Sequence, residues 1–315
     1  MRKLNKRISP SFITVVFLAL ANLASAQSNG YIKRGAYASA ETAVKQEKKS
    51  EDKLLYGPLP YRTLAETVGE TYIVLPLMDL FLKDGYSNLF LKGASKNISA
   101  KEGEGKLLKL TSLNEKEGFF IDSSGTEYRC EIIRERFTEL APIYDILSTK
   151  KRLINKPLWL NIKKYVVGDP YADKGTVIEN ARFAKVMVID VLASYSNNVP
   201  VFIIFKDDKG RVGYENANMS GTNSTIELPD LFIEKFFTEN PQTKYKLSDK
   251  TWAAVKAGRT EIGMPMDAVQ LIEGRPTKRN KSVIGNIRKE QWVYGETAIQ
   301  SYFYFENGKL TGISR

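Results

Sequence analysis

The stretches that decide the fold lie between residues 251 and 315: Thr251-Trp-Ala-Ala-Val-Lys-Ala-Gly258, Ile262-Gly-Met-Pro-Met-Asp-Ala-Val269, Glu273-Gly-Arg-Pro276, Gln291-Trp-Val-Tyr294 and Phe305-Glu-Asn-Gly-Lys-Leu310. The first two predict short helices, because Gly258 and Gly274 follow their apolar positions and Pro276 blocks continuation. Alternation in 291–294 and 299–305 predicts a hairpin, and Asn307-Gly308 predicts a tight turn before a last strand, 309–314. We therefore expect two helices packed on a three-stranded antiparallel sheet over 248–315.

Local signals place the ends and faces of these elements. Ser248 or Asp249 is expected to cap the first helix, and Pro265 suits the first turn of the second. Met266, Val269 and Ile272 are expected to form the buried stripe of the second helix. Trp292 is expected to pack against that stripe, and the alternative is an exposed anchor for a partner.

The same residues carry a family resemblance. Gly263-Met264 precedes the second helix, Gly274-Arg275-Pro276 ends it, Trp292-Val293-Tyr294 forms a strand, and Phe305-Glu-Asn-Gly-Lys309 forms the closing hairpin. This pattern resembles the BamE/SmpA-OmlA family of small envelope modules, which implies their fold and a role in binding and bracing other proteins. The chain lacks that family's lipidated Cys and has a large N-terminal part. Membership in the outer-membrane barrel-assembly machine therefore does not carry over.

The middle of the chain predicts two similar β-rich units, 56–147 and 148–226. Four strand-like stretches recur in the same order: Thr71-Tyr-Ile-Val-Leu75, 105–110, 119–121 and 126–132 in the first, and Pro157-Leu-Trp-Leu-Asn-Ile162, 184–191, 201–205 and 211–215 in the second. Self-similarity of this kind is typical of two copies of one unit. Strand order and turn spacing resemble tandem bacterial SH3-like β-modules, which implies small rolls or barrels. One larger antiparallel β-domain is the alternative. The fold class is accordingly α+β.

Two polar segments flank these units. Residues 27–55 have no apolar period and predict a polar tether, with a short exposed helix as the alternative. Residues 227–247 predict a linker helix and connector. That helix, 227–238, would dock a wide apolar face made by Leu231, Phe232, Ile233, Phe236 and Phe237.

The N-terminus predicts export. Residues 1–26 combine an apolar run, 12–23, and an Ala24-Ser-Ala26 end with four early cations, Arg2, Lys3, Lys6 and Arg7. This is typical of a signal peptide, and an N-terminal membrane anchor is the alternative. No other run reaches the roughly 18 apolar residues that a transmembrane helix needs. We expect a mature chain that starts at Gln27, is periplasmic or secreted, has no transmembrane segment after signal removal, and is not a lipoprotein.

Composition limits the chemistry. The chain has no His, which excludes His-based acid–base catalysis and imidazole metal ligands. Its single Cys, Cys130, lies in an alternating run and is expected to be a buried thiol; the alternative is a reactive nucleophile. Asp122, Asp207 and Asp208 are expected to serve turns. Gly103-Glu-Gly-Lys106 lacks the spacing of a P-loop, and Asn-x-Ser/Thr triplets start at Asn97, Asn218 and Asn223. We expect no catalytic, cofactor-binding or metal-ligating residues and no cofactor, and the pattern singles out no ligand-binding residue.

The expected function is therefore non-catalytic. We expect an exported envelope protein that binds or scaffolds other envelope proteins or cell-wall polymer. The alternative is a carboxylate-based, glycosidase-like hydrolase of the envelope. The net charge of +11 would ordinarily suggest nucleic acid, but export argues against it and favours anionic head groups and polymers; a solvated Lys-rich surface is the alternative.

Overall fold

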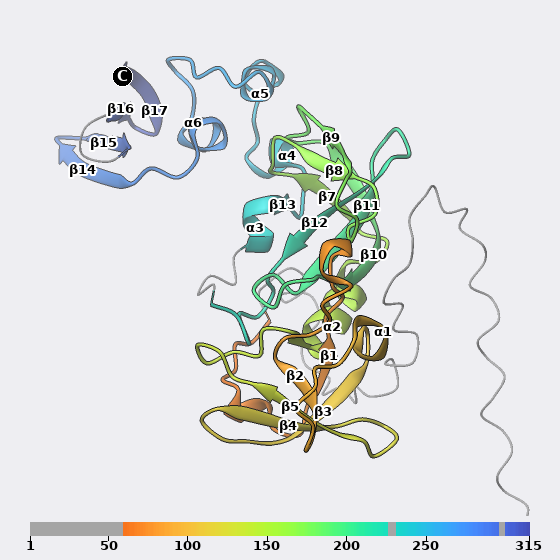
Figure 1. Ribbon diagram of the computed structural model, residues 1–315. Helices are drawn as coiled ribbons and strands as arrows, with labels where there is room; N and C mark the ends of the chain where they lie inside the picture. The colour runs from red at the N-terminus through yellow and green to blue at the C-terminus, as the bar shows by residue number, and fades with distance from the viewer. Residues whose placement is uncertain (1–58, 226–230, 296–299) are drawn as a thin grey trace, which may run out of the picture.

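The chain forms three antiparallel sheets, one after another along the sequence (Figure 1). The computed structural model describes residues 59–225, 231–295 and 300–315. Short helices join the sheets, so the expected class, α+β with mostly antiparallel strands, is confirmed. The predicted signal peptide and polar tether lie outside the described residues.

The first sheet has six strands in the order β2-β5-β4-β3-β1-β6. Alternation selects its inner face: in β5, Tyr128 and Cys130 are buried while the residues between and beside them are not. The hairpin expected around Asp122–Gly125 joins β4 and β5, with Gly125 at φ +87°. The strands are β1 (Thr71–Val74), β2 (Leu89–Leu91), β3 (Leu107–Leu113), β4 (Glu117–Ile121), β5 (Glu127–Glu131) and β6 (Leu140–Pro142); α1 (Ala100–Gly103) and two 3-10 helices, η2 (Ala65–Thr67) and η3 (Asp79–Phe81), connect them.

The second sheet has seven strands in the order β13-β7-β10-β11-β12-β8-β9. Its central strand β11 is buried on both faces over five residues, Val201–Phe205, which explains its continuous apolar sequence. The strands are β7 (Pro157–Leu160), β8 (Tyr165–Val167), β9 (Thr176–Ile178), β10 (Lys185–Ala193), β11 (Val201–Lys206), β12 (Val212–Ala217) and β13 (Phe236–Phe237).

The two sheets share their strand order. The series β6-β1-β3-β4-β5-β2 corresponds to β13-β7-β10-β11-β12-β8, with every neighbouring pair antiparallel. A β-bulge interrupts both long strands at the same place, between Leu110 and Ser112 in β3 and between Val188 and Asp190 in β10. The expected repeat is therefore met at the level of strand order, and superposition of the whole units stays a prediction.

The helix α2 (Ile143–Leu153) lies between the two sheets (Figure 1). Ile146 and Leu153 belong to one apolar core that also contains Ile73 of β1 and Ile203 of β11. The boundary expected at 147/148 falls inside this helix. A shared apolar core is expected of one larger domain, whereas a shared strand order is expected of a repeat. The molecule shows both features.

The linker helix ends earlier than expected. α3 spans Leu231–Lys235, residues 226–230 lie outside the described chain, and Phe236 and Phe237 form β13 instead of the last helical turn. The reason is long-range: Phe236 pairs with Leu160 and Phe237 with Trp159 of β7, and these ladder bonds end the helix. The connector contains α4 (Pro241–Lys244).

The C-terminal part has two helices and a four-stranded sheet, where three strands were expected. The order β14-β15-β16-β17 places the unexpected strand β14 (Lys278–Ile284) at the edge; the other elements are α5 (Asp249–Lys256), α6 (Met266–Glu273), β15 (Ile287–Tyr294), β16 (Ser301–Glu306) and β17 (Lys309–Ser314). All seven residues of β14 are exposed. Its sequence therefore lacks the apolar alternation that marks a half-buried strand.

Caps and turns of this part are as predicted. The Ser248 hydroxyl accepts a hydrogen bond from the Thr251 N–H, and Pro265 precedes the first residue of α6. Gly274 ends α6 at φ +86°. Asn307 and Gly308, at φ +47° and +81°, form the two-residue turn between β16 and β17.

Trp292 is buried in the core beneath the helices, as expected. Only 1% of it is exposed, and its ring lies 4.5 Å from that of Phe305. The expected stripe on α6 is partly wrong: Val269 is fully buried, but Met266 and Ile272 are half-buried, and Ala268 and Leu271 take their place. A three-residue spacing falls behind the helical turn by about 60° at each step, so the ends of that stripe diverge from one face. Ile299, which was expected on the same face as Phe303, lies outside the described residues.

Candidate functional site

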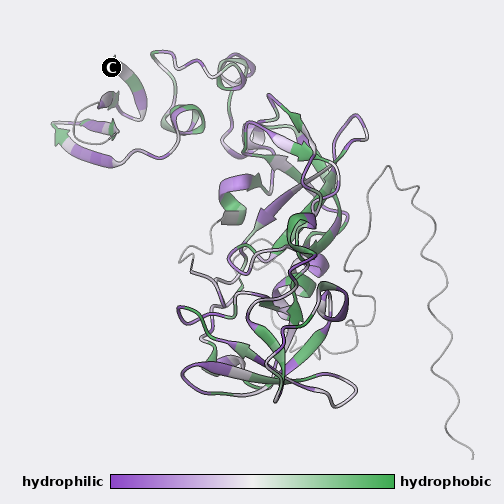
Figure 2. Cartoon of the chain, in the orientation of Figure 1, coloured by the Kyte–Doolittle hydropathy of each residue, from purple (hydrophilic) through white to green (hydrophobic). Residues whose placement is uncertain are grey.

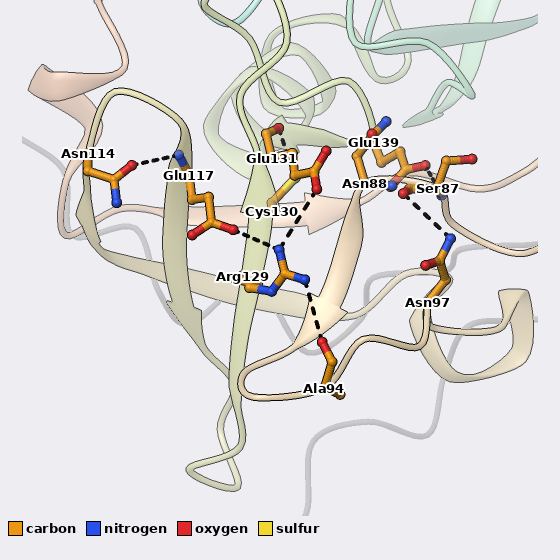
Figure 3. Close-up of polar contacts among 10 residues, drawn as sticks. All are labelled: Ser87, Asn88, Ala94, Asn97, Asn114, Glu117, Arg129, Cys130, Glu131 and Glu139. Carbon is orange, nitrogen blue, oxygen red and sulfur yellow. Dashed lines mark hydrogen bonds and ion pairs between the residues drawn. The ribbon is translucent and has the colours of Figure 1, made fainter.

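Cys130 is a core residue of the first sheet (Figure 3). Its side chain has no exposed surface, and burial raises the pKa of the thiol well above its usual value. Reactive thiols are accessible and carry lowered pKa values, so this cysteine is an inert apolar group, as expected.

Asp122 holds the turn between β4 and β5. Its Oδ1 accepts the backbone N–H groups of Ser124 and Thr126 at 2.9 and 3.0 Å. Its Oδ2 accepts the Tyr128 hydroxyl at 3.0 Å and faces Lys106 Nζ at 3.3 Å. The Ser124 hydroxyl is the main cause that lowers the pKa of this carboxyl. Every contact stabilises the turn, so the expected structural role is supported.

Asp207 stabilises the turn between β11 and β12 in the same way. Its Oδ1 accepts the N–H groups of Lys209 and Arg211, and its Oδ2 accepts the Tyr165 hydroxyl at 2.7 Å. Burial acts to raise its pKa, but the hydrogen bonds from Tyr165 and Arg211 prevail and lower it. The next residue, Asp208, is exposed in the turn.

A pocket of about 730 Å³ lies at the end of β4 and β5. Three carboxylates line it, from Glu115, Glu117 and Glu131. Glu117 and Glu131 face each other across the strands, and Arg129 lies between them at 2.7 and 3.8 Å (Figure 3). The arginine offsets one of the two negative charges and contacts both carboxylates, which is typical of a structural ion-pair cluster on a sheet surface.

A second candidate is the hairpin of β14 and β15, residues 278–294, which we call the basic hairpin. Val283, Ile284 and Ile287 surround its two-residue turn and are 70%, 62% and 40% exposed. Figure 2 shows β14 hydrophilic along its stem and hydrophobic at its tip. An apolar tip on an exposed ribbon is typical of a contact surface, because nothing within the described chain covers it.

Positive charge is distributed along the same hairpin. Within residues 278–289 the hairpin carries five cationic side chains: Lys278, Arg279, Lys281, Arg288 and Lys289. Of the five, Lys281 pairs with Glu290 at 3.8 Å and Lys289 with Glu306 at 3.0 Å. Both pairs are largely exposed and contribute little to stability. The hairpin therefore presents net positive charge beside apolar side chains.

The outer edge of the hairpin is also open to pairing. β14 forms ladder bonds with β15 and with no other described strand, so one row of its backbone groups faces outward. One feature of the sequence does indicate this hairpin. Gly285-Asn286 between Ile284 and Ile287 is a two-residue hairpin turn.

Metal sites and membrane-spanning helices are the remaining candidate features of the described segments. No group of three metal-ligating side chains occurs in them, and none of their helices is both long and apolar enough to cross a membrane. Comparison with protein-family models, curated proteins and solved structures finds no match to this chain.

Proposed function

We propose that the protein is an exported, non-catalytic envelope protein that docks on other envelope proteins through the basic hairpin. The exposed apolar tip carries this proposal. Burial of Val283, Ile284 and Ile287 in a partner would contribute on the order of 5 kcal/mol before the cost of association. A partner with an apolar pocket and an acidic rim matches both the tip and the five cations.

The wider assignment rests on sequence features and strand order. Residues 1–26 support export, and the Gly-Met and Gly-x-Pro motifs around α6 support a BamE-like module. The shared strand order of the first two sheets supports SH3-like units. Cell-wall polymer is the second partner class, because an anionic polymer also matches the cations. The apolar tip favours a protein, since polysaccharide offers it no apolar pocket.

Site-specific photo-crosslinking in intact cells tests the docking proposal. A crosslinking residue at position 284 should give a discrete protein adduct, and the same residue at Val177, half exposed on β9, should not. Lys281→Glu with Arg288→Glu should abolish the adduct and leave the melting temperature unchanged. The proposal fails if positions 284 and 177 give the same products. An adduct with polymer alone would make the wall the partner.

A carboxylate hydrolase is the alternative, favoured only by the pocket that holds Glu117 and Glu131. Glu117 and Glu131 are directly opposed on neighbouring strands, which brings two carboxylates to one pocket as a glycosidase pair requires. Hydrolysis of wall polysaccharide that is lost on Glu117→Gln would support this alternative. The contact of both carboxylates with Arg129 argues for the structural role instead.

A further inference from the structure

A separate pocket lies where the second sheet meets the C-terminal helices. It has a volume of about 360 Å³. One wall comes from the second sheet, its loops and α3, and the other from α6 and from Tyr245 just after α4; the polar and aromatic residues that matter here are Asn161, Arg182, Phe237, Tyr245, Asp267 and Arg275. Junctions between packed units are frequent sites for small ligands, and this volume lies within the usual range of about 300–1,000 Å³.

Arg182 is the unusual group in this pocket. Its Nη2 donates to Asn161 Oδ1 at 3.2 Å, and its guanidinium lies 4.9 Å from the Phe183 ring. Its Nε–H is buried and has no hydrogen-bond partner in the described chain. A buried donor without an acceptor costs about 1–3 kcal/mol, so a ligand oxygen atom placed beside this arginine would gain a hydrogen bond that the protein itself does not supply.

The remaining charges of the pocket have both signs. Arg275 lies just beyond the end of α6, Asp267 lies in its first turn, and Glu234 lies on α3. Neither these three nor Arg182 forms an ion pair within the part of the chain that the structure describes, although all four line one pocket. A ligand that carries one carboxylate and one ammonium group would complement this arrangement.

Apolar surface completes the lining. Phe237, Leu271 and Ile233 contribute aromatic and aliphatic side chains, and the Tyr245 ring lies among them. Such a surface accepts small side chains or methyl groups between the two charged ends. Inorganic phosphate would meet the cations but would leave the carboxylates and the apolar wall without a partner.

We propose that this pocket binds a short peptide with free ends, whose carboxylate is held by Arg182 and Arg275 and whose ammonium group is held by Asp267 or Glu234. The site is distinct from the basic hairpin, so it goes beyond the docking function and does not depend on it. A peptide at this junction would contact both the second sheet and α6, and would stabilise their relative position.

Calorimetric titration of the full chain with tri-alanine tests the proposal. Tri-alanine should bind, whereas N-acetylated and C-terminally amidated tri-alanine should each bind at least tenfold more weakly. Arg275→Gln, at an exposed position, should weaken tri-alanine at least tenfold and remove its advantage over the amide. Arg182→Gln should do the same, and Asp267→Asn should reduce the advantage over the acetylated peptide.

Matched controls define failure. Arg259→Gln changes an exposed arginine that does not line the pocket and should leave affinity unchanged. Melting curves establish that each variant is folded. If Arg182→Gln does not fold, the affinity of Arg275→Gln for tri-alanine tests the proposal by itself. The proposal is overturned if tri-alanine does not bind at about 10 mM, if the three peptides bind equally, or if Arg275→Gln has no effect. Equal binding of inorganic phosphate would also overturn it.

Discussion

Asp145, on α2 between the two sheets, has no exposed surface. Its Oδ2 accepts the Ser220 hydroxyl at 2.6 Å, but its Oδ1 is buried without a hydrogen-bond partner in the described chain, as is Nη2 of Arg62. Burial raises the pKa of Asp145 from its ordinary 3.8 to about 6, against the opposing influence of Ser220 and Arg62. The ionised form is therefore less stable in the folded protein than in the unfolded chain.

This carboxyl should make stability fall as pH rises. Its contribution is fully present below about pH 4, where both states are protonated, and is lost as pH rises through the folded pKa near 6. The loss is on the order of 3 kcal/mol. Urea denaturation of wild type and Asp145→Asn from pH 4 to 7 should show the wild type losing stability relative to the variant.

The comparison of two curves isolates Asp145 from other groups. Glu139 also has a pKa raised by burial, whereas the pKa values of Asp122 and Asp207 are lowered, so the wild-type profile alone is a composite. Curves that stay parallel across this pH range would contradict the assignment.

Trp292 should be essential for stability. Its burial removes a large aromatic surface from water, and Trp292→Ala should cost about 3–5 kcal/mol once the cavity is included. Tyr304→Ala is the matched control, because Tyr304 lies on the neighbouring strand with 41% of its surface exposed. Thermal melts measure both. An unchanged melting temperature for Trp292→Ala, with loss of a binding partner, would make Trp292 an exposed anchor.

Single residues were predictable where the cause is local. The Ser248 cap, the Asn307-Gly308 turn and the burial of Cys130 follow from neighbours in sequence. Asp145 was not predictable, because its burial depends on Ser220 and Arg62, which lie far away along the chain.

Among the elements, the turns held by Asp122 and Asp207 can be compared directly with the neighbouring exposed residue Asp208. Asp122→Ala and Asp207→Ala each remove an acceptor of several hydrogen bonds, and each should cost about 1–3 kcal/mol. Asp208→Ala, next to one of them and exposed, should change little. Chemical denaturation at pH 7 measures all three, and equal losses for Asp207 and Asp208 would contradict the turn assignment.

These turns also have a pH signature opposite to that of Asp145. The pKa of Asp122 is lowered in the folded state, so its contribution is present above the ordinary value of 3.8 and is lost as pH falls below it. The difference between wild type and Asp122→Ala should therefore shrink in acid.

Elements were predictable where the pattern is amphipathic. The hairpin of β4 and β5 and the helices α5 and α6 have a buried face and an exposed one, and they were anticipated. The hairpin of β11 and β12 was anticipated from the continuous apolar run of β11 instead. β14 has no buried face, and β13 is a strand only because β7 pairs with it. The basic hairpin was missed for the first reason, since its function depends on residues that the core does not select.

At the scale of the whole molecule, a buried polar loop joins the first two sheets. The Asn223 amide donates to the carbonyls of Phe137 and Leu140 at 2.9 and 2.7 Å and accepts the Phe137 N–H at 2.7 Å. Asn218 and Asn223, which begin Asn-x-Ser/Thr triplets, are both buried. This loop and α2 therefore link the two sheets through buried hydrogen bonds and a shared apolar core.

The pocket that Arg182 lines could not be predicted from the sequence, because it exists only after several elements have packed together. The pocket of Arg182 collects residues between 161 and 275 from several elements. No spacing along the chain signals such a set, whereas the absence of His did narrow the possible chemistry.

The single buried thiol is a built-in probe of how the first sheet opens. Cys130 lies at 0% exposure in the core of the first sheet, so a thiol reagent can reach it only when that core opens. The rate of its modification under native conditions then reports how often the first sheet opens, without any introduced label. Because the chain has no second cysteine, the signal comes from one place. If a ligand or partner that binds elsewhere slows the modification of Cys130, its binding stabilises the first sheet from a distance.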